Sequence, residues 1–339
     1  MKKSMMLLGF VCLLIIPLSV WADGNSRPQF LIKFATVAPE GSTWMKQMKM
    51  LDTQIRERSN GRLGFKFYAG GIAGDEVDVL RRMRIGQIHC AAFSGVGFGQ
   101  ILPRLRVLDL PFLFRNDEET DRVHRELRPF FAKELKQKGF VLLSWAEVGD
   151  VHLFSKAPIR QVGDLDGLKV WTWSGDPIAK ETFTAMGVNP IPLAITDVTT
   201  ALNTGMIDTV YAPPLGALAL QWQRYVRYMM ALPLVHSTGA LLISSRYFHK
   251  LPEDLARILT DNAEQAMAGL TAQLREQNQE ALQVLQDSGV TITPAPEGKA
   301  LKRFHEIGAQ VAVKLAGKMY PEELLDRLYT VLKREPRAQ

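Results

Sequence analysis

The sequence predicts an α/β protein of two lobes, with mixed sheets flanked by helices and a ligand cleft between the lobes. Two observations support this prediction. Apolar strand-like runs alternate with amphipathic helical patterns, first over 28–150 and again over 151–236. Such β-α-β alternation is typical of a mostly parallel sheet with helices on both faces. In addition, the helical pattern over 252–289 is much longer than an ordinary domain helix, which suits a brace across two lobes.

The first half of the chain contains four predicted strands separated by helices or a long connection. A capping Ser42 or Thr43 precedes an apolar helical stripe that begins at Trp44. Gly86 marks the end of the second helix, because glycine favours the backbone conformation that terminates helices. The predicted strands are 30–38, 62–70, 87–95 and 140–147, and the predicted helices are 39–61, 75–86 and 117–138.

The pattern restarts after residue 150. The predicted strands there are 151–156, 168–173, 189–194 and 208–214, and the predicted helices are 176–187 and 196–207. A further strand, 238–248, is expected to cross back to the first lobe. We therefore predict that lobe I comprises 28–150 plus about 237–270, and lobe II comprises 151–236 plus about 271–335.

The N-terminus predicts export. Lys2 and Lys3 precede a long apolar run, and a small residue precedes Asp23. This order is typical of a secretory signal peptide, here 1–22, and predicts a periplasmic protein. A transmembrane anchor is the alternative; Pro17 and the small residue at the cleavage position favour the signal peptide.

Cysteine and charge further limit the class. Cleavage after residue 22 removes Cys12 and leaves Cys90 alone, so an internal disulfide is excluded and the core must hold the fold. The 41 Lys and Arg and the 35 Asp and Glu are interleaved along predicted helices. That pattern is typical of a solvated surface, and we expect no nucleic-acid partner.

The sequence contains no pattern that requires catalysis. The stretch 95–100 ends in Gln where a dinucleotide fingerprint needs its last glycine, so we interpret it as a turn at a strand end. Asp75 and Glu76 are adjacent acids at a helix start, where the helix dipole favours them. We expect no enzymatic activity and no cofactor.

The histidines show no spacing suited to a metal ion, and we predict no metal site. We expect His124 at the surface, and His152 and His236 as structural residues beside the cleft.

Six motifs then occur in a familiar order. They are "FATVAPEGS", "GDEVDVLRRMRIGQI", "VLDLPFLFR", "DLDGLKVW", "MGVNPIPLAITDVTTALNTGMIDTV" and "LPEDLARIL". With them the chain resembles, over about 28–330, the extracytoplasmic substrate-binding proteins of TRAP (tripartite ATP-independent periplasmic) transporters. The resemblance implies a periplasmic binding protein fold that closes on a small ligand. It also implies small and large membrane subunits as partners, uptake driven by an ion gradient, and room for an additional periplasmic partner protein.

The resemblance also indicates where the ligand binds and how this chain departs from the family. Members of the family clamp a carboxylate with an arginine at the position of Trp171, and often with a second at Val151. A polar asparagine usually stands at Ala212, before Pro213, whereas Asp75 remains acidic. The predicted ligand-binding residues are Val37, Asp75, Phe93, Ser94, Val151, Trp171, Ile195, Tyr211, Ala212 and Pro213.

These departures predict an apolar ligand. A carboxylate buried without a cation costs several kcal/mol, whereas a tryptophan that buries about 150–250 Å² could contribute about 4–6 kcal/mol to an apolar ligand. We expect Trp171 to face the cleft and Trp173 to pack in the core; the alternative places Trp171 in the core. The predicted function is delivery of a small hydrophobic or amphipathic ligand to a TRAP transporter, with a cation as second choice of ligand. The alternatives are an organic-acid carrier with relocated charge recognition, or a ligand-presenting sensory module.

Overall fold

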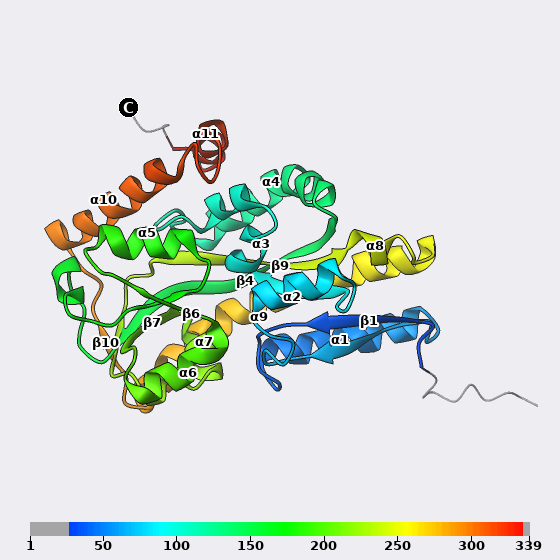
Figure 1. Ribbon diagram of the computed structural model, residues 1–339, viewed down its shortest axis with the longest axis horizontal. Helices are drawn as coiled ribbons and strands as arrows, with labels where there is room; N and C mark the ends of the chain where they lie inside the picture. Colours follow the sequence, from blue (N-terminus) through cyan, green and yellow to red (C-terminus); the bar gives the residue numbers. More distant parts are fainter. Residues whose placement is uncertain (1–26, 335–339) are drawn as a thin grey trace, which may run out of the picture.

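The computed structural model describes residues 27–334 and has two lobes that share long strands (Figure 1). The strands are β1 (Phe30–Ala35), β2 (Leu63–Tyr68), β3 (Cys90–Ser94), β4 (Phe140–Ser155), β5 (Trp171–Trp173), β6 (Ile191–Leu193), β7 (Thr209–Ala212), β8 (Tyr228–Met230), β9 (Val235–Ser244) and β10 (Thr291–Thr293). The α-helices are α1 (Thr43–Arg58), α2 (Glu76–Arg84), α3 (Gly95–Gly99), α4 (Asp117–Gln137), α5 (Pro177–Ala185), α6 (Ile195–Thr204), α7 (Pro214–Ala219), α8 (Ser245–Phe248), α9 (Glu253–Asp287), α10 (Gly298–Leu315) and α11 (Glu322–Val331). Short 3₁₀ helices are η1 (Pro103–Asp109), η2 (Val162–Leu165) and η3 (Trp222–Arg224).

The sheet is mixed, as predicted. β2, β1 and β3 pair in parallel, and β9 is antiparallel to both β3 and β4. The far end of β4 pairs antiparallel with β7 and β8, and β8 pairs with β10. β5 and β6 form a small parallel sheet, connected to β7 by a bridge between Val170 and Thr209. β4 and β9 are therefore the strands that carry the chain between the lobes.

The long strand β4 differs from the sequence prediction. The two strands expected at 140–147 and 151–156 form one continuous strand. Its register against β9 shifts between Leu142 and Ser144 and again between Glu147 and Gly149. Gly149 has a φ of 110°, which glycine adopts without strain, so the glycine allows a bulge within a strand rather than a break. The expected lobe boundary lies inside this strand, and the division into lobes at given residues stays a prediction.

The long helix forms as predicted and contacts both lobes. α9 packs against α1, against α7 and against β4. Leu259, Leu270 and Leu285 along its length are fully buried. Because these apolar residues recur on one face over the whole helix, α9 supports the two lobes from one side.

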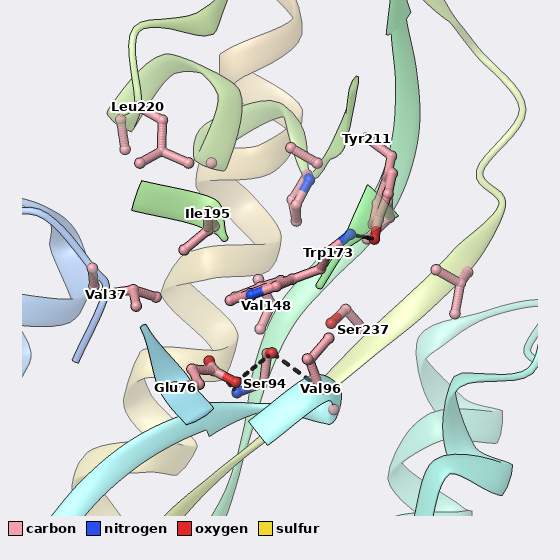
Figure 2. Close-up of a pocket in the computed structure, with 18 of the residues that line it drawn as sticks. Val37, Glu76, Ser94, Val96, Val148, Trp173, Ile195, Tyr211, Leu220 and Ser237 are labelled. Atoms are coloured by element: carbon pink, nitrogen blue, oxygen red, sulfur yellow. Dashed lines mark hydrogen bonds between the residues drawn. The ribbon is translucent and has the colours of Figure 1, made fainter. Parts of the chain in front are cut away.

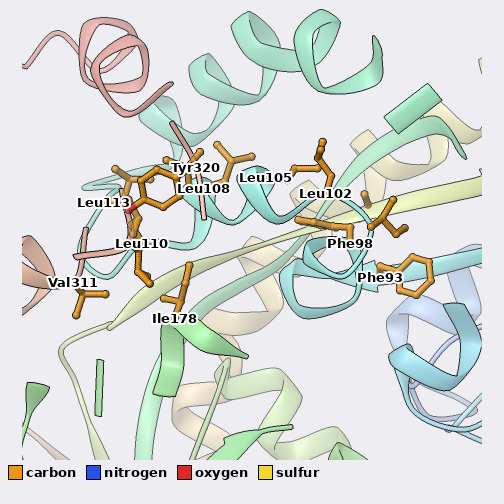
Figure 3. Packing of buried hydrophobic residues seen from close by; sticks show 14 of the residues in the cluster. Phe93, Phe98, Leu102, Leu105, Leu108, Leu110, Leu113, Ile178, Val311 and Tyr320 are labelled. Atoms are coloured by element: carbon orange, nitrogen blue, oxygen red, sulfur yellow. The ribbon is translucent and has the colours of Figure 1, made fainter. Parts of the chain in front are cut away.

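The largest hydrophobic core lies beneath α4 and extends to α5, α10 and α11 (Figure 3). Phe98, Leu105 and Ile178 come from different elements and are all part of it. The C-terminal helices return to this core: α11 packs against α4, and α10 packs against α5. The Tyr320 hydroxyl donates a hydrogen bond of 2.6 Å to the Ala312 carbonyl, which holds the turn between these helices.

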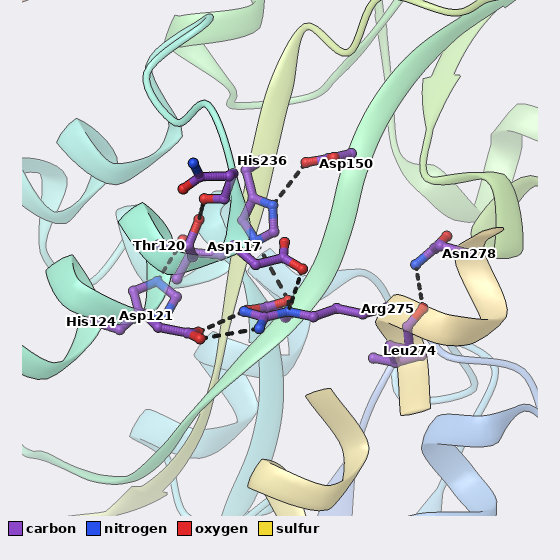
Figure 4. Close-up of polar contacts among 12 residues, drawn as sticks. Asp117, Thr120, Asp121, His124, Asp150, His236, Leu274, Arg275 and Asn278 are labelled. Atoms are coloured by element: carbon purple, nitrogen blue, oxygen red, sulfur yellow. Dashed lines mark hydrogen bonds and ion pairs between the residues drawn. The ribbon is translucent and has the colours of Figure 1, made fainter. Parts of the chain in front are cut away.

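An ion network joins α9 to the strands that connect the lobes (Figure 4). The guanidinium of Arg275 pairs with Glu147 of β4 and, at 2.6 Å, with Asp121 of α4. His236 of β9 lies 2.8 Å from Asp150 and 3.6 Å from Glu147. Burial lowers the pKa of His236, but the two carboxylates raise it by more, to about 9. The imidazole is therefore a cation at neutral pH, which stabilises this acidic cluster.

Several local predictions are corrected. His124, expected at the surface, is buried; its Nε2 lies 3.1 Å from the Thr238 hydroxyl, and its ring stacks on Trp145. The strand expected over 238–248 is β9, which starts earlier and ends at Ser244, where α8 begins. His152 is a structural residue as expected, because its Nδ1 lies 3.0 Å from a backbone carbonyl. None of the helices between residues 27 and 334 is both long and apolar enough to cross a bilayer.

Candidate ligand cavity

A cavity of about 530 Å³ lies between the lobes (Figure 2). Its walls are the loops that follow β1 and β3 on one side and β5, β6 and β7 on the other. Ligands in α/β proteins bind at the carboxyl ends of parallel strands, where side chains from successive loops converge. Most of the lining residues are apolar, such as Val96, Val148 and Leu220.

Most of the predicted ligand-binding residues meet at this cavity. Those that line it are Val37, Phe93, Ser94, Val151, Trp171, Ile195, Tyr211, Ala212 and Pro213. Asp75 stands behind the lining and contacts it through Trp173. The cavity also contains residues that the sequence did not single out for binding: Glu76, Arg106, Asp109, Trp173, Asp176 and Ser237.

Trp171 forms part of an aromatic cluster in lobe II. Its ring stacks on Tyr211 with the centroids 4.7 Å apart and meets Trp222 edge-on at 5.5 Å. The indole N–H donates a hydrogen bond of 3.1 Å to the Leu193 carbonyl. Only 1% of the residue is exposed, so it contributes to the cavity wall from within a packed cluster.

Trp173 was expected to pack in the core, but it also lines the cavity, and its ring lies across the space in Figure 2. The indole N–H donates to Asp75 Oδ2 at 2.8 Å, and the backbone N–H donates to the Tyr211 hydroxyl at 3.0 Å. Both tryptophans point to the same side because strand residues two apart share a face.

Arg106 is the one cation among the described residues that line the cavity. Its Nη1 pairs with Asp109 at 2.9 Å and its Nη2 pairs with Asp176 at 2.6 Å. All three residues are buried, and a single guanidinium therefore stands between two carboxylates. Burial raises the pKa of Asp109 to about 6, against the opposing effect of Arg106. The charge available to an anionic ligand is already neutralised.

The glycine-rich stretch expected as a turn forms the short helix α3, and its glycines make room for these charges. A Cβ on Gly95 would lie 1.7 Å from Asp109 Oδ2, and one on Gly99 would lie 2.5 Å from Arg106 Cδ. Any larger residue would displace the buried pair, so the spacing of the glycines serves packing rather than nucleotide binding.

Glu76 forms part of the cavity floor. Its Oε1 accepts a hydrogen bond of 2.8 Å from the Ser94 backbone N–H. Its Oε2 accepts from the Ser94 hydroxyl at 2.9 Å and from the Gly97 N–H at 2.7 Å. Burial raises the pKa of this carboxyl to about 7 despite these bonds, and the negative charge of Asp75 adds to the shift.

The described residues include no group of three His, Cys, Asp or Glu side chains placed to hold a metal ion. Cys90 is buried in β3, and burial raises the pKa of its thiol, so it is not poised as a nucleophile. Two lobes around a mostly apolar cavity are the arrangement expected of a protein that binds a small solute.

Comparison with known proteins gives the family. The model of the family described as "Bacterial extracellular solute-binding protein, family 7" matches residues 34–316, and the chain belongs to this family. A solute-binding protein of Chromohalobacter salexigens is 26% identical over 259 residues, which cover 76% of this chain and 77% of the relative. The 2,3-diketo-L-gulonate-binding periplasmic protein of Escherichia coli K12 is also 26% identical, over 74% of this chain and 77% of its own length.

Solved structures share the fold. The sugar acid binding protein of Advenella mimigardefordensis, in complex with galactonate, has a TM-score of 0.85 at 22% identity and covers 91% of this chain and 98% of its own. A TRAP periplasmic solute-binding protein of Sulfurospirillum deleyianum with bound succinate has a TM-score of 0.84 at 19% identity, over 90% and 99% of the two chains.

Membership of this family sets the role of the protein. It is a substrate-binding transport protein of the TRAP type rather than an enzyme; such proteins bind small molecules outside the cytoplasm and deliver them to TRAP membrane subunits. The family is periplasmic, whereas the predicted signal peptide at 1–22 lies outside the described residues. The two solved structures named above hold organic acids.

Proposed function

We propose that this protein binds a solute with an apolar body and no negative charge, and delivers it to a TRAP transporter. The observation that carries the proposal is the state of Arg106. It is the one cation among the described lining residues, and Asp109 and Asp176 already pair with it.

A carboxylate would meet an unfavourable field in this cavity. To pair with Nη1 or Nη2 of Arg106 it would have to displace Asp109 or Asp176, and the displaced carboxylate would then lie buried without its cation. Breaking a buried ion pair in this way costs about 3–5 kcal/mol. An apolar ligand pays no such cost, and burial of about 250 Å² of its surface contributes about 6 kcal/mol.

An organic-acid carrier is the second candidate, and one observation favours it. The Nε of Arg106 is buried and has no hydrogen-bond partner, so one donor of the guanidinium remains available beside the cavity. The organic acids in the related structures agree with this alternative. Under it, a ligand carboxylate accepts from Nε while the two aspartates keep their bonds.

The two candidates are separated by ligands that share a tail and differ in the head. The protein is unfolded and refolded to remove any bound ligand, and decanol and decanoate are titrated while tryptophan fluorescence is recorded. We expect decanol to bind at least about tenfold tighter, because decanoate must bury an uncompensated charge. Tighter binding of decanoate, lost in Arg106→Met but kept in a surface control such as Arg81→Met, contradicts the proposal and establishes the acid carrier.

A further inference from the structure

The cavity floor carries polar groups from three different elements of lobe I. Glu76 begins α2, Ser94 ends β3, and Ser237 lies in β9, the strand that pairs with β3. All three line the cavity, and Figure 2 shows them below the ring of Trp173. Apart from this floor and the Arg106–Asp109–Asp176 ion group, most of the lining is apolar.

The Glu76 carboxylate retains capacity to accept a hydrogen bond. Above its pKa of about 7 the group is ionised and offers about four acceptor sites, two on each oxygen. Oε2 uses two of them, for the Ser94 hydroxyl and the Gly97 N–H, whereas Oε1 accepts only from the Ser94 N–H. One acceptor site on Oε1 therefore remains open in a residue that lines the cavity.

Ser237 supplies a second open group. Its hydroxyl forms no hydrogen bond with any residue between 27 and 334, and in Figure 2 it points into the cavity. A hydroxyl both donates and accepts, so it can complete the hydrogen bonding of a ligand group that also donates to Glu76.

The charges around the floor select the same kind of ligand. Asp75 lies next to Glu76, and the two aspartates beside Arg106 outnumber that cation. Burial is the main cause that raises the pKa of both Asp75 and Glu76, so neither carboxyl has a cation that compensates its charge. A ligand that donates a hydrogen bond, or that carries a positive charge, supplies what this floor lacks.

We infer that the polar head of the ligand is a hydrogen-bond donor, such as a hydroxyl, an amide or an ammonium group. This head donates to Glu76 and forms a second hydrogen bond with the Ser237 hydroxyl. This inference rests on the proposed function, because it concerns the head of a ligand whose body is apolar. Glu76 and Ser237 thereby determine specificity. An apolar tail alone, or a head that only accepts hydrogen bonds, leaves the open acceptor site of Glu76 without a donor.

The test uses two ligands of equal size. Decanol and nonyl methyl ether have the same number of heavy atoms, but only decanol donates a hydrogen bond. We expect the wild-type protein to bind decanol about tenfold tighter, since a hydrogen bond to a charged group contributes about 1.5–3 kcal/mol. Ser237→Ala reduces this preference about threefold, and Glu76→Gln reduces it by at least as much, because a neutral amide oxygen accepts more weakly than a carboxylate. The dissociation constant of the ether stays within about twofold of the wild-type value.

Asp78→Asn is the matched control. Asp78 lies on the same helix and carries the same charge, but its side chain is half exposed and pairs with Arg81 outside the cavity. The control keeps the preference for decanol, so a general loss of negative charge does not explain the result. If Glu76→Gln does not fold, Ser237→Ala decides, because it removes one hydroxyl that has no partner in the fold.

The outcomes separate this inference from the proposed function. Equal binding of decanol and the ether by the wild-type protein refutes the donor head and leaves the apolar ligand standing. A preference for decanol that persists undiminished in both Glu76→Gln and Ser237→Ala refutes the role of these residues. Binding of decanoate alone refutes the proposed function, and the inference with it.

Discussion

Asp176→Asn tests whether the two lobes close on each other through contacts of their own. The segment Trp173–Asp176 reaches lobe I through three side-chain contacts. Trp173 donates to Asp75 at 2.8 Å, Gln100 donates to the Gly175 carbonyl at 3.0 Å, and Arg106 donates to Asp176 at 2.6 Å. None of these contacts requires a ligand, so we expect them to contribute to closure in the empty protein.

The substitution isolates one of the three contacts. Asp176 Oδ1 also accepts hydrogen bonds from the Ile178 and Ala179 N–H groups and so caps α5. Asparagine caps helices about as well as aspartate, so the helix is preserved while the charge that faces Arg106 is removed. A buried hydrogen bond between charged groups contributes about 1.5–3 kcal/mol. The ratio of open to closed molecules should therefore rise about 10- to 150-fold.

Small-angle scattering measures the effect. We expect the radius of gyration of the ligand-free variant to exceed that of the wild type, and saturating ligand to restore it. Asp164→Asn, a similar change in the capping box at the start of η2, is the control and leaves the radius unchanged. A variant that is less stable to urea but has the wild-type radius would show that Asp176 holds one lobe together rather than two.

Three further predictions concern stability and binding. The pKa of His236 is raised from 6.5 to about 9, so its ion pairs stabilise the fold fully below about pH 6.5, and this stabilisation is lost as the pH rises through about 9. The contribution is on the order of 3 kcal/mol. Urea unfolding measured across this pH range should show it in the wild type and not in His236→Gln. Trp171→Arg should lower the free energy of unfolding by about 3–5 kcal/mol, because it buries a charge between Tyr211 and Trp222; a stable variant that binds decanoate would contradict this. Trp173→Phe should weaken decanol binding about tenfold, because the buried Asp75 carboxylate loses the hydrogen bond from the indole N–H. Calorimetry that shows unchanged decanol binding would exclude this contact from closure.

Most of the positions that the family resemblance indicated lie at one cavity, and strand geometry explains part of this. Val37, Ser94 and Tyr211 follow or end different apolar strands, and the carboxyl ends of parallel strands lie at one edge of a sheet. Alternation along β5 also placed Trp171 and Trp173 on one face. The alternation could not show which ring covers the cavity, because the position of the Trp173 ring depends on its hydrogen bond to Asp75, about a hundred residues away in the chain.

The buried charges could not be predicted from local patterns. Arg106 stands in a short segment with another arginine and resembles a surface residue; its burial depends on Asp176, 70 positions later. Glu76 was interpreted as a helix-start acid, and only the turn of α3 brings the Gly97 N–H to it. The strands expected at 140–147 and 151–156 are one strand with a bulge, and the partner strand β9 that accommodates the bulge comes much later in the chain.

The most direct test of the account is the identity of the ligand that the protein retains. Protein purified from its native periplasm is denatured, and the released small molecules are extracted and identified by mass spectrometry. We predict an uncharged or cationic molecule with an apolar body and a hydrogen-bond-donating head. It should be present at about one molecule per protein, and at a lower amount in a matched Glu76→Gln preparation. A carboxylate recovered in that amount would contradict the account.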